Sequence, residues 1–268
     1  AHIHTNGPAG VNGPVLFNLT GASGTSGTLN LAPTAVTPAQ VADLRAKRWY
    51  VNIHTTNFPD GEIRGQIKIA TTPSDFDGDG RTDIRVFRPS DNGFYILNSI
   101  NNSMTFNAFA GSGIISSSHD DYDGDGRSDL VTFVAQGTTR VWRILQTASN
   151  TVREVQWGQI SANDRIVPAD YDGDGKTDLA VWRPAEGNWF VINSSNGVVG
   201  IQAWGLQTAP YNDIPVPADY DGDGRADLAV WRPASGTWFI INSSTGAITA
   251  IGFGVNGDIP VPAFNIVQ

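Results

Sequence analysis

Short apolar runs alternate with turns rich in Gly, Asn, Ser and Asp along residues 75–268. Typical runs are Leu-Ala-Val-Trp at 179–182 and Trp-Phe-Val-Ile at 189–192, which mix β-branched and aromatic side chains. Runs of this length and composition are typical of β-strands, and the apolar spacing that marks a helix is missing from this region. The pattern therefore predicts an all-β region of short antiparallel strands joined by turns.

The apolar runs recur at a nearly constant interval. Asp-Leu-Ala-Val-Trp-Arg-Pro occurs at 178–184 and again at 227–233, and Asp-Ile-Arg-Val-Phe-Arg-Pro at 83–89 is a looser copy. A period of about 45–50 residues is typical of a solenoid, a propeller or an array. Each unit holds four such runs, which predicts four strands in each unit.

An acidic loop opens each unit. The pattern Asp-x-Asp-Gly-Asp-Gly-x-x-Asp begins at Asp75, Asp121, Asp170 and Asp219, at intervals of 46, 49 and 49 residues. These loops hold 16 of the 26 acidic residues, so the rest of the chain, with ten acidic and 17 basic residues, carries a charge of +7. Four divalent cations would change the formal net charge from −9 to −1. The charge distribution therefore indicates one cation for each loop.

The spacing inside the loop suits calcium. Aspartates at positions 1, 3 and 5 converge when the chain coils around one point, and Gly at position 6 permits the sharp turn. Position 7 can offer its backbone carbonyl while its charged side chain points to solvent, and the Asp at position 9 closes the coordination sphere. Magnesium fits less well because it prefers a rigid octahedron, and an acidic turn without a metal would leave its carboxylates repelling one another. The predicted calcium ligands are Asp75, Asp77, Asp79, Arg81 and Asp83; Asp121, Asp123, Asp125, Arg127 and Asp129; Asp170, Asp172, Asp174, Lys176 and Asp178; and Asp219, Asp221, Asp223, Arg225 and Asp227.

These loops, set in units of this length, resemble the FG-GAP/VCBS-type calcium-binding repeats of integrin-like propellers. The resemblance covers residues 71–268 and implies a β-propeller in which each unit forms one blade, here a small four-bladed ring. Ile-Pro-Val-Pro-Ala at 259–263 begins a fifth unit, but Phe264 stands where a loop Asp would be. A final strand of this kind would close the ring on the first blade. An open stack of the four units is the alternative.

Two sets of side chains recur with the repeat outside the loops. We expect the recurring tryptophans to pack between blades rather than to form platforms for sugars. They are Trp182, Trp189, Trp204, Trp231 and Trp238. We expect the arginines that precede Pro, namely Arg88, Arg183 and Arg232, to anchor loops or neighbouring blades.

Residues 1–70 carry none of this repeat and form a separate predicted domain. The runs Ala-His-Ile-His at 1–4, Tyr-Val-Asn-Ile-His at 50–54 and Gly-Glu-Ile-Arg-Gly-Gln-Ile at 61–67 resemble the C-terminal half of a chordin-type (CHRD) domain. The resemblance implies a small Greek-key, sandwich-like β fold. Between its strands, Thr37 as N-cap and Gln40 three residues later predict one short helix.

The chain begins inside the Ala-His-Ile-His run, so the strands that precede this run in the family are missing. Half a β-sandwich leaves one apolar face and at least one edge strand uncovered, and such an edge can pair with another chain. We expect either that a neighbouring molecule supplies the missing strands, which would assemble the protein into a polymer, or that the front half was removed or lies outside this sequence.

Three histidines of this domain are predicted to lie together. His2 and His4 are two residues apart and share one face of a strand, and His54 shares a face of another strand with Asn52. Three imidazoles could bind zinc or copper. The sequence shows no nearby fourth ligand and therefore favours a structural, hydrogen-bonded cluster. His119, beside the second acidic loop, lies outside the group.

Composition narrows the function classes. Cysteine is absent, so disulfides and thiolate metal sites are excluded, and the acidic balance argues against a nucleic-acid partner. The sequence lacks a run of about 18 apolar residues, so we expect no membrane insertion. It also lacks a Gly-x-Ser-x-Gly elbow, a phosphate loop and a Cys nucleophile, so we expect no enzymatic activity. The opening without Met or a leader indicates the processed product of a secreted protein.

We therefore expect an extracellular, calcium-stabilised structural or adhesive protein that binds about four calcium ions. Its expected partner is another copy of itself or another extracellular protein, and strand complementation of the incomplete domain would make it the subunit of a surface filament or matrix. A carbohydrate-binding, lectin-like propeller with glycan partners is the alternative. A metal-dependent enzyme at the histidine cluster, with zinc or copper, ranks last.

Overall fold

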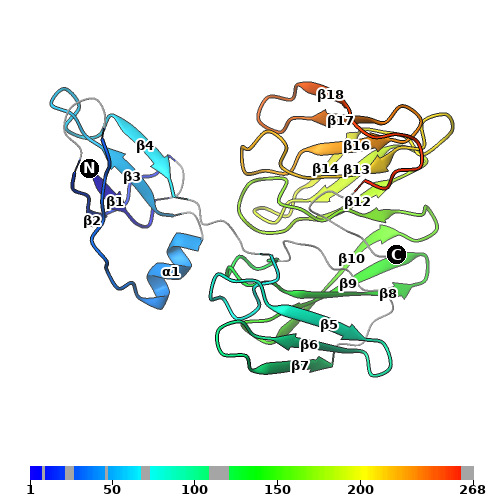
Figure 1. The fold of residues 1–268 in the computed structure, drawn as a ribbon, viewed down its shortest axis with the longest axis horizontal. Coiled ribbons are helices and arrows are strands. Elements are labelled where there is room, and N and C mark those ends of the chain that lie inside the picture. The colour runs from blue at the N-terminus through cyan, green and yellow to red at the C-terminus, as the bar shows by residue number, and fades with distance from the viewer. Residues whose placement is uncertain (8–9, 22–26, 46–47, 68–72, 109–120, 261–268) are drawn as a thin grey trace. The chain divides into compact units, whose positions relative to one another are not determined.

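The structure, a computed structural model, describes residues 1–7, 10–21, 27–45, 48–67, 73–108 and 121–260 (Figure 1). The chain divides into two compact units, Ala1–Ala70 and Thr71–Gln268, and each is described by itself. The predicted domain boundary at residue 70 and His119 lie outside the described residues. Antiparallel sheets build both units, so the expected all-β fold class is confirmed.

The first unit is a four-stranded antiparallel sheet with the order β2-β1-β3-β4. Its strands are β1 (His2–His4), β2 (Val15–Asn18), β3 (Tyr50–Ile53) and β4 (Ile63–Gln66). Because side chains alternate across a strand, His2 and His4 share one face of β1, whereas Ile3 lies on the other face and is buried. Among the described residues of this unit, the edge strands are β2 and β4, on which Val15 and Ile63 are 50% and 60% exposed.

One helix, α1 (Pro38–Arg45), connects β2 to β3. The predicted capping box is present: the Gln40 N–H donates to the Thr37 hydroxyl at 3.2 Å, and the Thr37 N–H donates to the Gln40 side chain at 2.8 Å. Asp43 of this helix is buried and accepts hydrogen bonds from the Asn6 N–H, at 3.0 Å, and from the Thr5 hydroxyl. These bonds tie the helix to the segment that follows β1.

The described residues of the second unit form four antiparallel sheets that follow one another along the chain (Figure 1). The first two sheets are β5 (Ile84–Arg88), β6 (Gly93–Leu97) and β7 (Met104–Ala108), and then β8 (Leu130–Gln136), β9 (Thr139–Gln146) and β10 (Thr151–Gln159). The last two sheets are β11 (Arg165–Ile166), β12 (Leu179–Arg183), β13 (Asn188–Ile192) and β14 (Val199–Ala203), and then β15 (Ile214–Pro215), β16 (Leu228–Arg232), β17 (Thr237–Ile241) and β18 (Ile248–Gly252).

The prediction of four strands in each repeat is confirmed for the last two sheets of the second unit, whereas the first two sheets have three described strands. In the last two sheets the additional strand precedes the acidic loop. The segments that precede the first two loops, 68–72 and 109–120, lie outside the described residues.

Hydrophobic cores between consecutive sheets hold the second unit together. Both faces of β12 are buried: Leu179 and Val181 pack against β8 and β9 of the preceding sheet, whereas Ala180 and Trp182 pack against Val230 of the following sheet. A further core joins the first sheet to the second. Burial on both faces explains why these strands have continuous apolar runs instead of an alternating pattern.

Three recurring tryptophans, Trp182, Trp189 and Trp204, belong to the core between the third and fourth sheets, as predicted, whereas Trp231 and Trp238 pack within the last sheet. The side chains of Trp182 and Trp189 are fully buried, and both indoles donate hydrogen bonds to the carbonyl of Trp204, each at 3.0 Å. The equivalent pair one repeat later donates to the carbonyl of Phe253. A buried indole N–H needs an acceptor, and the repeat supplies one to each of these four tryptophans.

The first and last sheets each leave apolar side chains exposed. Val86 of β5 is 54% exposed, although it corresponds in the repeat to the buried Val181 of β12. Phe253, which follows β18 and corresponds to the partly buried Trp204, is 75% exposed. Residues 261–268, which include the end of the predicted closing strand and Phe264, lie outside the described residues. Closure of the ring therefore stays a prediction.

Candidate metal centres

Each acidic loop brings three carboxylates together. Their oxygen atoms, contributed by loop positions 1, 3 and 9, lie within 4.8 Å of one another in all four loops. The four groups are Asp75, Asp77 and Asp83; Asp121, Asp123 and Asp129; Asp170, Asp172 and Asp178; and Asp219, Asp221 and Asp227. The aspartate at position 9 is buried in every group, whereas the position 1 aspartate is buried in the first two loops and exposed in the last.

Backbone hydrogen bonds to the carboxylates shape each loop. In the third loop, Asp170 accepts from the N–H groups of Gly173 at 2.6 Å and Gly175 at 2.7 Å, one on each oxygen. These glycines have φ angles of 79° and 91°, a region that favours glycine at positions 4 and 6. Asp178 accepts from the Tyr171 N–H at 2.8 Å, so the end of the loop is tied to its beginning. The same bonds recur in the other three loops.

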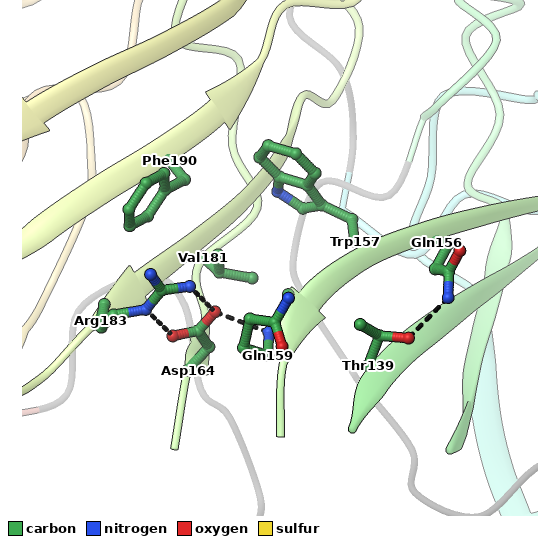
Figure 2. Close-up of a pocket in the computed structure, with 9 residues that line it drawn as sticks. Thr139, Gln156, Trp157, Gln159, Asp164, Val181, Arg183 and Phe190 are labelled. Carbon is green, nitrogen blue, oxygen red and sulfur yellow. Dashed lines mark hydrogen bonds and ion pairs between the residues drawn. The ribbon is translucent and has the colours of Figure 1, made fainter. Parts of the chain in front are cut away.

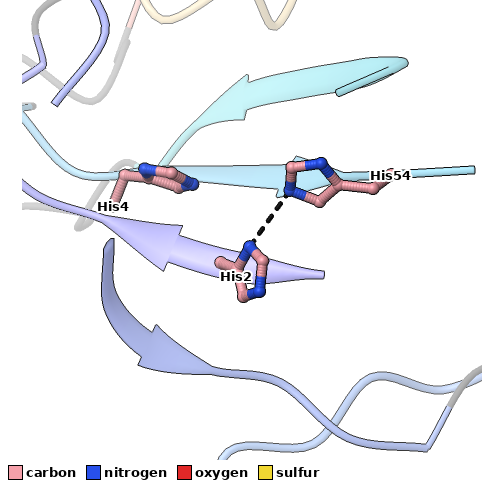
Figure 3. A group of neighbouring side chains, drawn as sticks. All are labelled: His2, His4 and His54. Carbon is pink, nitrogen blue, oxygen red and sulfur yellow. Dashed lines mark hydrogen bonds between the residues drawn. The ribbon is translucent and has the colours of Figure 1, made fainter. Parts of the chain in front are cut away.

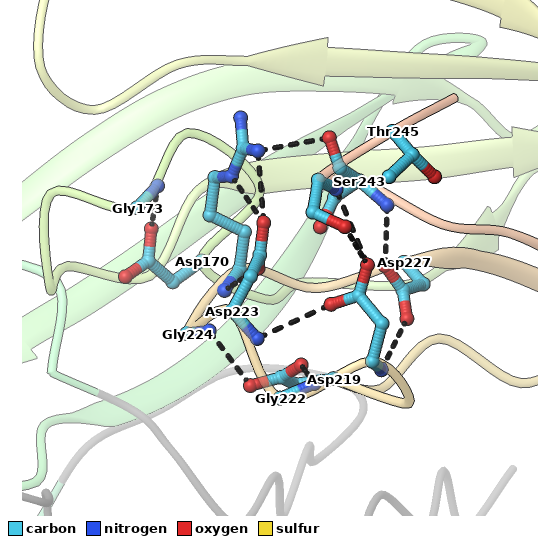
Figure 4. A network of polar contacts seen from close by, with 12 residues as sticks. Asp170, Gly173, Asp219, Gly222, Asp223, Gly224, Asp227, Ser243 and Thr245 are labelled. Atoms are coloured by element: carbon cyan, nitrogen blue, oxygen red, sulfur yellow. Dashed lines mark hydrogen bonds and ion pairs between the residues drawn. The ribbon is translucent and has the colours of Figure 1, made fainter. Parts of the chain in front are cut away.

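A turn that follows the next pair of strands forms a second wall of the loop. Ser194 donates its N–H to Asp178 at 2.7 Å and its hydroxyl to Asp174 at 2.9 Å. The Ser195 hydroxyl donates to Asp172 at 2.6 Å. Figure 4 shows the equivalent turn against the fourth loop. The turn therefore holds the carboxylates at positions 3, 5 and 9 in place.

The sequence pattern alone did not predict that this turn contacts the acidic loop. The signal was present, because Asn-Ser-Ser occurs at 193–195 and 242–244, one repeat apart, and Asn-Ser at 98–99 is the counterpart in the first repeat. In the second repeat Thr147 takes the place of the serine and donates its N–H to Asp129 at 3.0 Å. The recurrence of these short polar residues could have associated them with the acidic loops.

The aspartate at position 5 lies outside the groups of three. In the third loop, Asp174 accepts hydrogen bonds from the Lys176 N–H at 2.8 Å and from the Ser194 hydroxyl. The predicted role of position 5, and that of the carbonyl at position 7, therefore stay predictions.

The basic side chains at position 7 were expected to point to solvent, but in the later loops they lie against the preceding loop. Arg225 lies against Gly173 of the preceding loop, where an added Cβ atom would be 2.7 Å from the Arg225 Cγ, and Lys176 lies against Gly124 in the same way. Arg81, in the first loop, is exposed. The side chains of the later loops do not simply point to solvent, because a glycine at position 4 leaves room for their aliphatic stems.

The backbone also joins the four loops to one another. At each junction the N–H at position 8 of one loop donates to the carbonyl of the position 1 aspartate in the preceding loop, at 2.7 Å. The bonds run from Ser128 to Asp75, from Thr177 to Asp121, and from Ala226 to Asp170. The loops therefore form a continuous series, and displacement of one loop would disturb the next.

Burial makes ionisation of the crowded carboxylates costly. It raises the pKa of Asp129 to about 8 and the pKa values of Asp121 and Asp178 to about 6, and repulsion from aspartates of the same loop adds to each shift. Burial also raises the pKa of Asp75. The half-buried Asp221 behaves differently, because the hydrogen bond from the Ser244 hydroxyl lowers its pKa.

This donor set fits a hard divalent cation. Ca²⁺ takes six to eight oxygen ligands from flexible loops, and each loop offers three carboxylates on a glycine-containing turn. The aspartates at positions 1, 3 and 9 would hold the ion. Its two positive charges would favour the ionised form of carboxylates that burial otherwise disfavours.

A pocket of about 300 Å³ lies between the second and third sheets (Figure 2). It is lined by Trp157 and Phe190, by the amides of Gln156 and Gln159, and by Arg183. The Trp157 indole nitrogen is buried and has no hydrogen-bond partner among the described residues. At the next junction the equivalent indole does have one, the carbonyl of Phe239 at 3.0 Å.

Arg183 and Arg232 anchor neighbouring segments, as predicted, whereas Arg88 pairs with Asp91 of its own hairpin at 3.7 Å. Arg183 makes two hydrogen bonds to Asp164, at 2.8 and 3.0 Å, and Arg232 makes two to Asp213, at 2.7 and 2.9 Å. The ring of Tyr211 lies 4.4 Å from the Arg232 guanidinium. The connection before Asp164 is two residues shorter than the one before Asp213 and contains no counterpart of this tyrosine. This difference explains why one face of Arg183 borders a pocket.

The three histidines of the first unit lie together, as Figure 3 shows. Nδ1 of His2 is 3.0 Å from Nε2 of His54, and the rings of His2 and His4 are 5.9 Å apart. Burial lowers the pKa of His2, as do the positive charge of the N-terminal amine and the two neighbouring imidazoles. His2 therefore favours its neutral form.

Comparisons with known proteins assign both regions of the chain. Residues 1–67 match the CHRD domain, and residues 121–181 and 170–230 match the FG-GAP-like repeat. The chain thus contains a CHRD domain followed by FG-GAP-like repeats, as the sequence predicted. Neither is an enzymatic family, and both are typical of extracellular proteins.

No curated protein matches the sequence. One similar solved structure is that of a structural genomics protein of unknown function from Bacteroides thetaiotaomicron VPI-5482, with 13% sequence identity and a TM-score of 0.39. The match covers 90% of this chain, which spans 62% of that protein. Among the described residues, no helix has the length and apolar character needed to cross a membrane.

Proposed function

We propose that this chain is an extracellular, calcium-stabilised structural or adhesive protein, the subunit of a surface filament or matrix. The observation that carries the proposal is the series of four acidic loops, each with three carboxylates within 4.8 Å and each joined to the next by a backbone hydrogen bond. Calcium in these loops would cross-link a chain that has no cysteine. Extracellular modules work at calcium concentrations high enough to fill loops of modest affinity.

Metal analysis and unfolding test the calcium part of this proposal. We expect about four calcium ions for each chain after dialysis against millimolar calcium. We also expect a large drop in melting temperature and faster proteolysis once a chelator removes them. Equal melting temperature and protease resistance with calcium and with chelator would contradict the proposal. Magnesium serves as the control, because it should restore little of the stability.

The edge strands of the first unit support assembly by strand addition. β2 and β4 end the sheet on either side, and each carries an exposed apolar residue, Val15 and Ile63. An edge of this kind offers unpaired N–H and C=O groups to a strand from a neighbouring molecule. The partner proposed for it is a second copy of this chain.

Sedimentation of the calcium-loaded chain and negative-stain images test the assembly. We expect oligomers or filaments, and we expect Ile63→Lys to abolish them because a charge on an edge strand opposes pairing. The matched control is Ile84→Lys, which adds a charge at an exposed apolar residue in the second unit. A monomer at every concentration would contradict self-assembly, and a loss of assembly in Ile84→Lys alone would assign the contact to the repeats instead.

The pocket between the second and third sheets favours glycan binding as a second candidate function. Trp157 and Phe190 offer ring surfaces on which a sugar could stack, and Gln156 and Gln159 offer amides that bind hydroxyl groups. A glycan array would test it: selective binding that Gln156→Ala removes and Gln202→Ala, on the exposed β14, leaves intact would favour the lectin-like function. An array without selective binding would dismiss it.

A further inference from the structure

The histidine cluster of the first unit contains a buried nitrogen that the calcium proposal does not explain. His4 is only 9% exposed, and its Nε2 has no hydrogen-bond partner among the described residues. Nδ1 of His4 lies 2.9 Å from the carbonyl oxygen of Gly13, which can only accept, so Nδ1 carries the proton. Nε2 of a neutral His4 therefore holds an unused lone pair. A buried polar atom without a partner needs an explanation, and a bound ion is one that a lone pair among three imidazoles would satisfy.

His54 is held in the same tautomer. Its Nδ1 lies 2.7 Å from the carbonyl oxygen of Pro59, so its Nε2 also carries a lone pair, and that lone pair is directed toward His2. Histidines that bind metals usually donate their other N–H to a carbonyl or carboxylate, which fixes the ring and the tautomer. Gly13 and Pro59 supply such carbonyls to two of the three rings.

His2 can complete the group by a change of tautomer. Its Nδ1 lies 3.0 Å from Nε2 of His54 and donates a hydrogen bond in the absence of metal. Moving this proton to Nε2 of the same ring would leave a third lone pair on Nδ1. One nitrogen from each of the three histidines lies within 4.8 Å of the others. Zn–N distances near 2.0–2.1 Å imply nitrogen–nitrogen separations of about 3.3 Å, which small ring rotations would reach.

Packing around His4 holds its ring in place. The ring stacks on Tyr50 with a centroid distance of 4.6 Å and an interplanar angle of 10°, and the Arg64 guanidinium lies 3.5 Å from the centre of the same tyrosine. The Tyr50 hydroxyl accepts a hydrogen bond from the Gly13 N–H at 3.1 Å. The residue that donates the buried lone pair is therefore preorganised.

We propose that His2, His4 and His54 bind one zinc or copper ion, through Nδ1 of His2 and Nε2 of the other two. Imidazole nitrogens select these metals, whereas calcium prefers oxygen ligands, so the site differs in chemistry from the acidic loops. Three protein ligands leave a further coordination position for water or for a side chain of a binding partner.

Calorimetric titration of the full chain with zinc, and separately with Cu²⁺, tests the site. Excess calcium keeps the acidic loops filled. We expect one ion for each chain, and a loss of affinity of at least about tenfold in His4→Ala and in His54→Ala. The matched control is His119→Ala, which removes the one remaining histidine of the sequence and should bind like the unaltered protein. Whichever metal binds more tightly identifies the preferred ion.

Two measurements keep the proposal falsifiable if a buried variant fails to fold. His2→Ala removes the least constrained ring, so near-ultraviolet circular dichroism should stay unchanged while affinity falls. Electron paramagnetic resonance of the copper-loaded chain should show coupling to three imidazole nitrogens, and to fewer in His2→Ala. Absence of zinc and copper binding in the unaltered chain would overturn the proposal. Equal binding in His2→Ala and His119→Ala would also overturn it.

Discussion

The acidic loops and the histidine cluster each gather three groups that can bind a metal, but they stabilise those groups in different ways. In the loops, burial opposes ionisation of the carboxylates and raises the pKa of Asp129 to about 8. In the cluster, His2 donates to His54, and carbonyl groups fix both His4 and His54. The comparison leads us to expect that charge, and not the number of ligands, decides which part of the chain depends on an ion for its stability.

Removal of calcium should give the largest effect and should separate the two units. An ion held at 100 times its dissociation constant contributes about 2.7 kcal/mol to the stability of the state that binds it. Four ions would therefore contribute on the order of 10 kcal/mol to the second unit. Peptide-resolved hydrogen exchange of the full chain with chelator should show loss of protection in β5–β18 and little change in β1–β4. Equal loss in both units would contradict the comparison.

Replacement of a buried loop carboxylate should destabilise the protein with calcium bound and stabilise it without calcium. Asp129→Asn removes a ligand, so we expect the calcium-loaded protein to lose the contribution of one ion, about 3 kcal/mol. In chelator the same substitution removes a group whose ionisation burial disfavours, so we expect the free energy of unfolding to rise by a few kcal/mol at neutral pH. Chemical denaturation with and without calcium measures both values.

Asp60→Asn is the matched control for this sign change, because Asp60 is exposed and lies in the first unit. Its effect should be small and independent of calcium. If Asp129→Asn destabilised the calcium-free protein as much as the calcium-loaded one, the burial of charge would not be what the ion relieves.

The backbone coil of each acidic loop could be predicted from the sequence, because residues close together in the chain determine it. Aspartates two residues apart and glycine at positions 4 and 6 lead to the observed coil, in which Asp170 accepts the N–H groups of Gly173 and Gly175. The turn at Ser194 could not be derived from that spacing, since it reaches the loop through the pairing of β12 with β13. The Arg225 side chain lies against Gly173 of the preceding repeat, so the spacing of residues within one loop could not predict this contact either.

For the histidine cluster, too, the sequence predicted the local arrangement but not the contacts with distant loops. Alternation along a strand placed His2 and His4 on one face, and the pairing of His2 with Asn52 in register brings His54 near them. The carbonyl groups that fix the tautomers come from Gly13 and Pro59, which lie in loops. Loop conformations depend on the complete fold, so the unpaired Nε2 of His4 could be found only in the structure.

The pH dependence of stability should have opposite slopes with and without calcium. Asp129 has a pKa of about 8 in the folded chain against 3.8 as its ordinary value. A folded pKa above the unfolded one gives stability that is complete below pH 4 and is lost as the pH rises to about 8. Calcium-free protein should therefore become less stable over this range.

The calcium-loaded protein should become more stable as the pH rises, because protons compete with the ion for the same carboxylates. Denaturation midpoints measured from pH 4 to pH 8 in chelator and in calcium test both slopes. Parallel curves would show that the loop carboxylates are not the groups that the ion neutralises.

The smallest effect should come from the cluster itself, which the comparison predicts to be stable without an ion. His2→Ala removes one hydrogen bond, to His54, from a partly exposed ring, so we expect a loss of about 1 kcal/mol in metal-free buffer. The loss should be the same with calcium and with chelator, because neutral imidazoles do not repel one another as buried carboxylates do. Denaturation of the first unit, followed by hydrogen exchange in β1 and β3, measures it, and His119→Ala is the control. If the effect of His2→Ala depended on calcium, the two kinds of site would be coupled, and the distinction between them would fail. A small effect that is the same with calcium and with chelator would show that charge alone makes the acidic loops, and not the histidine cluster, depend on an ion.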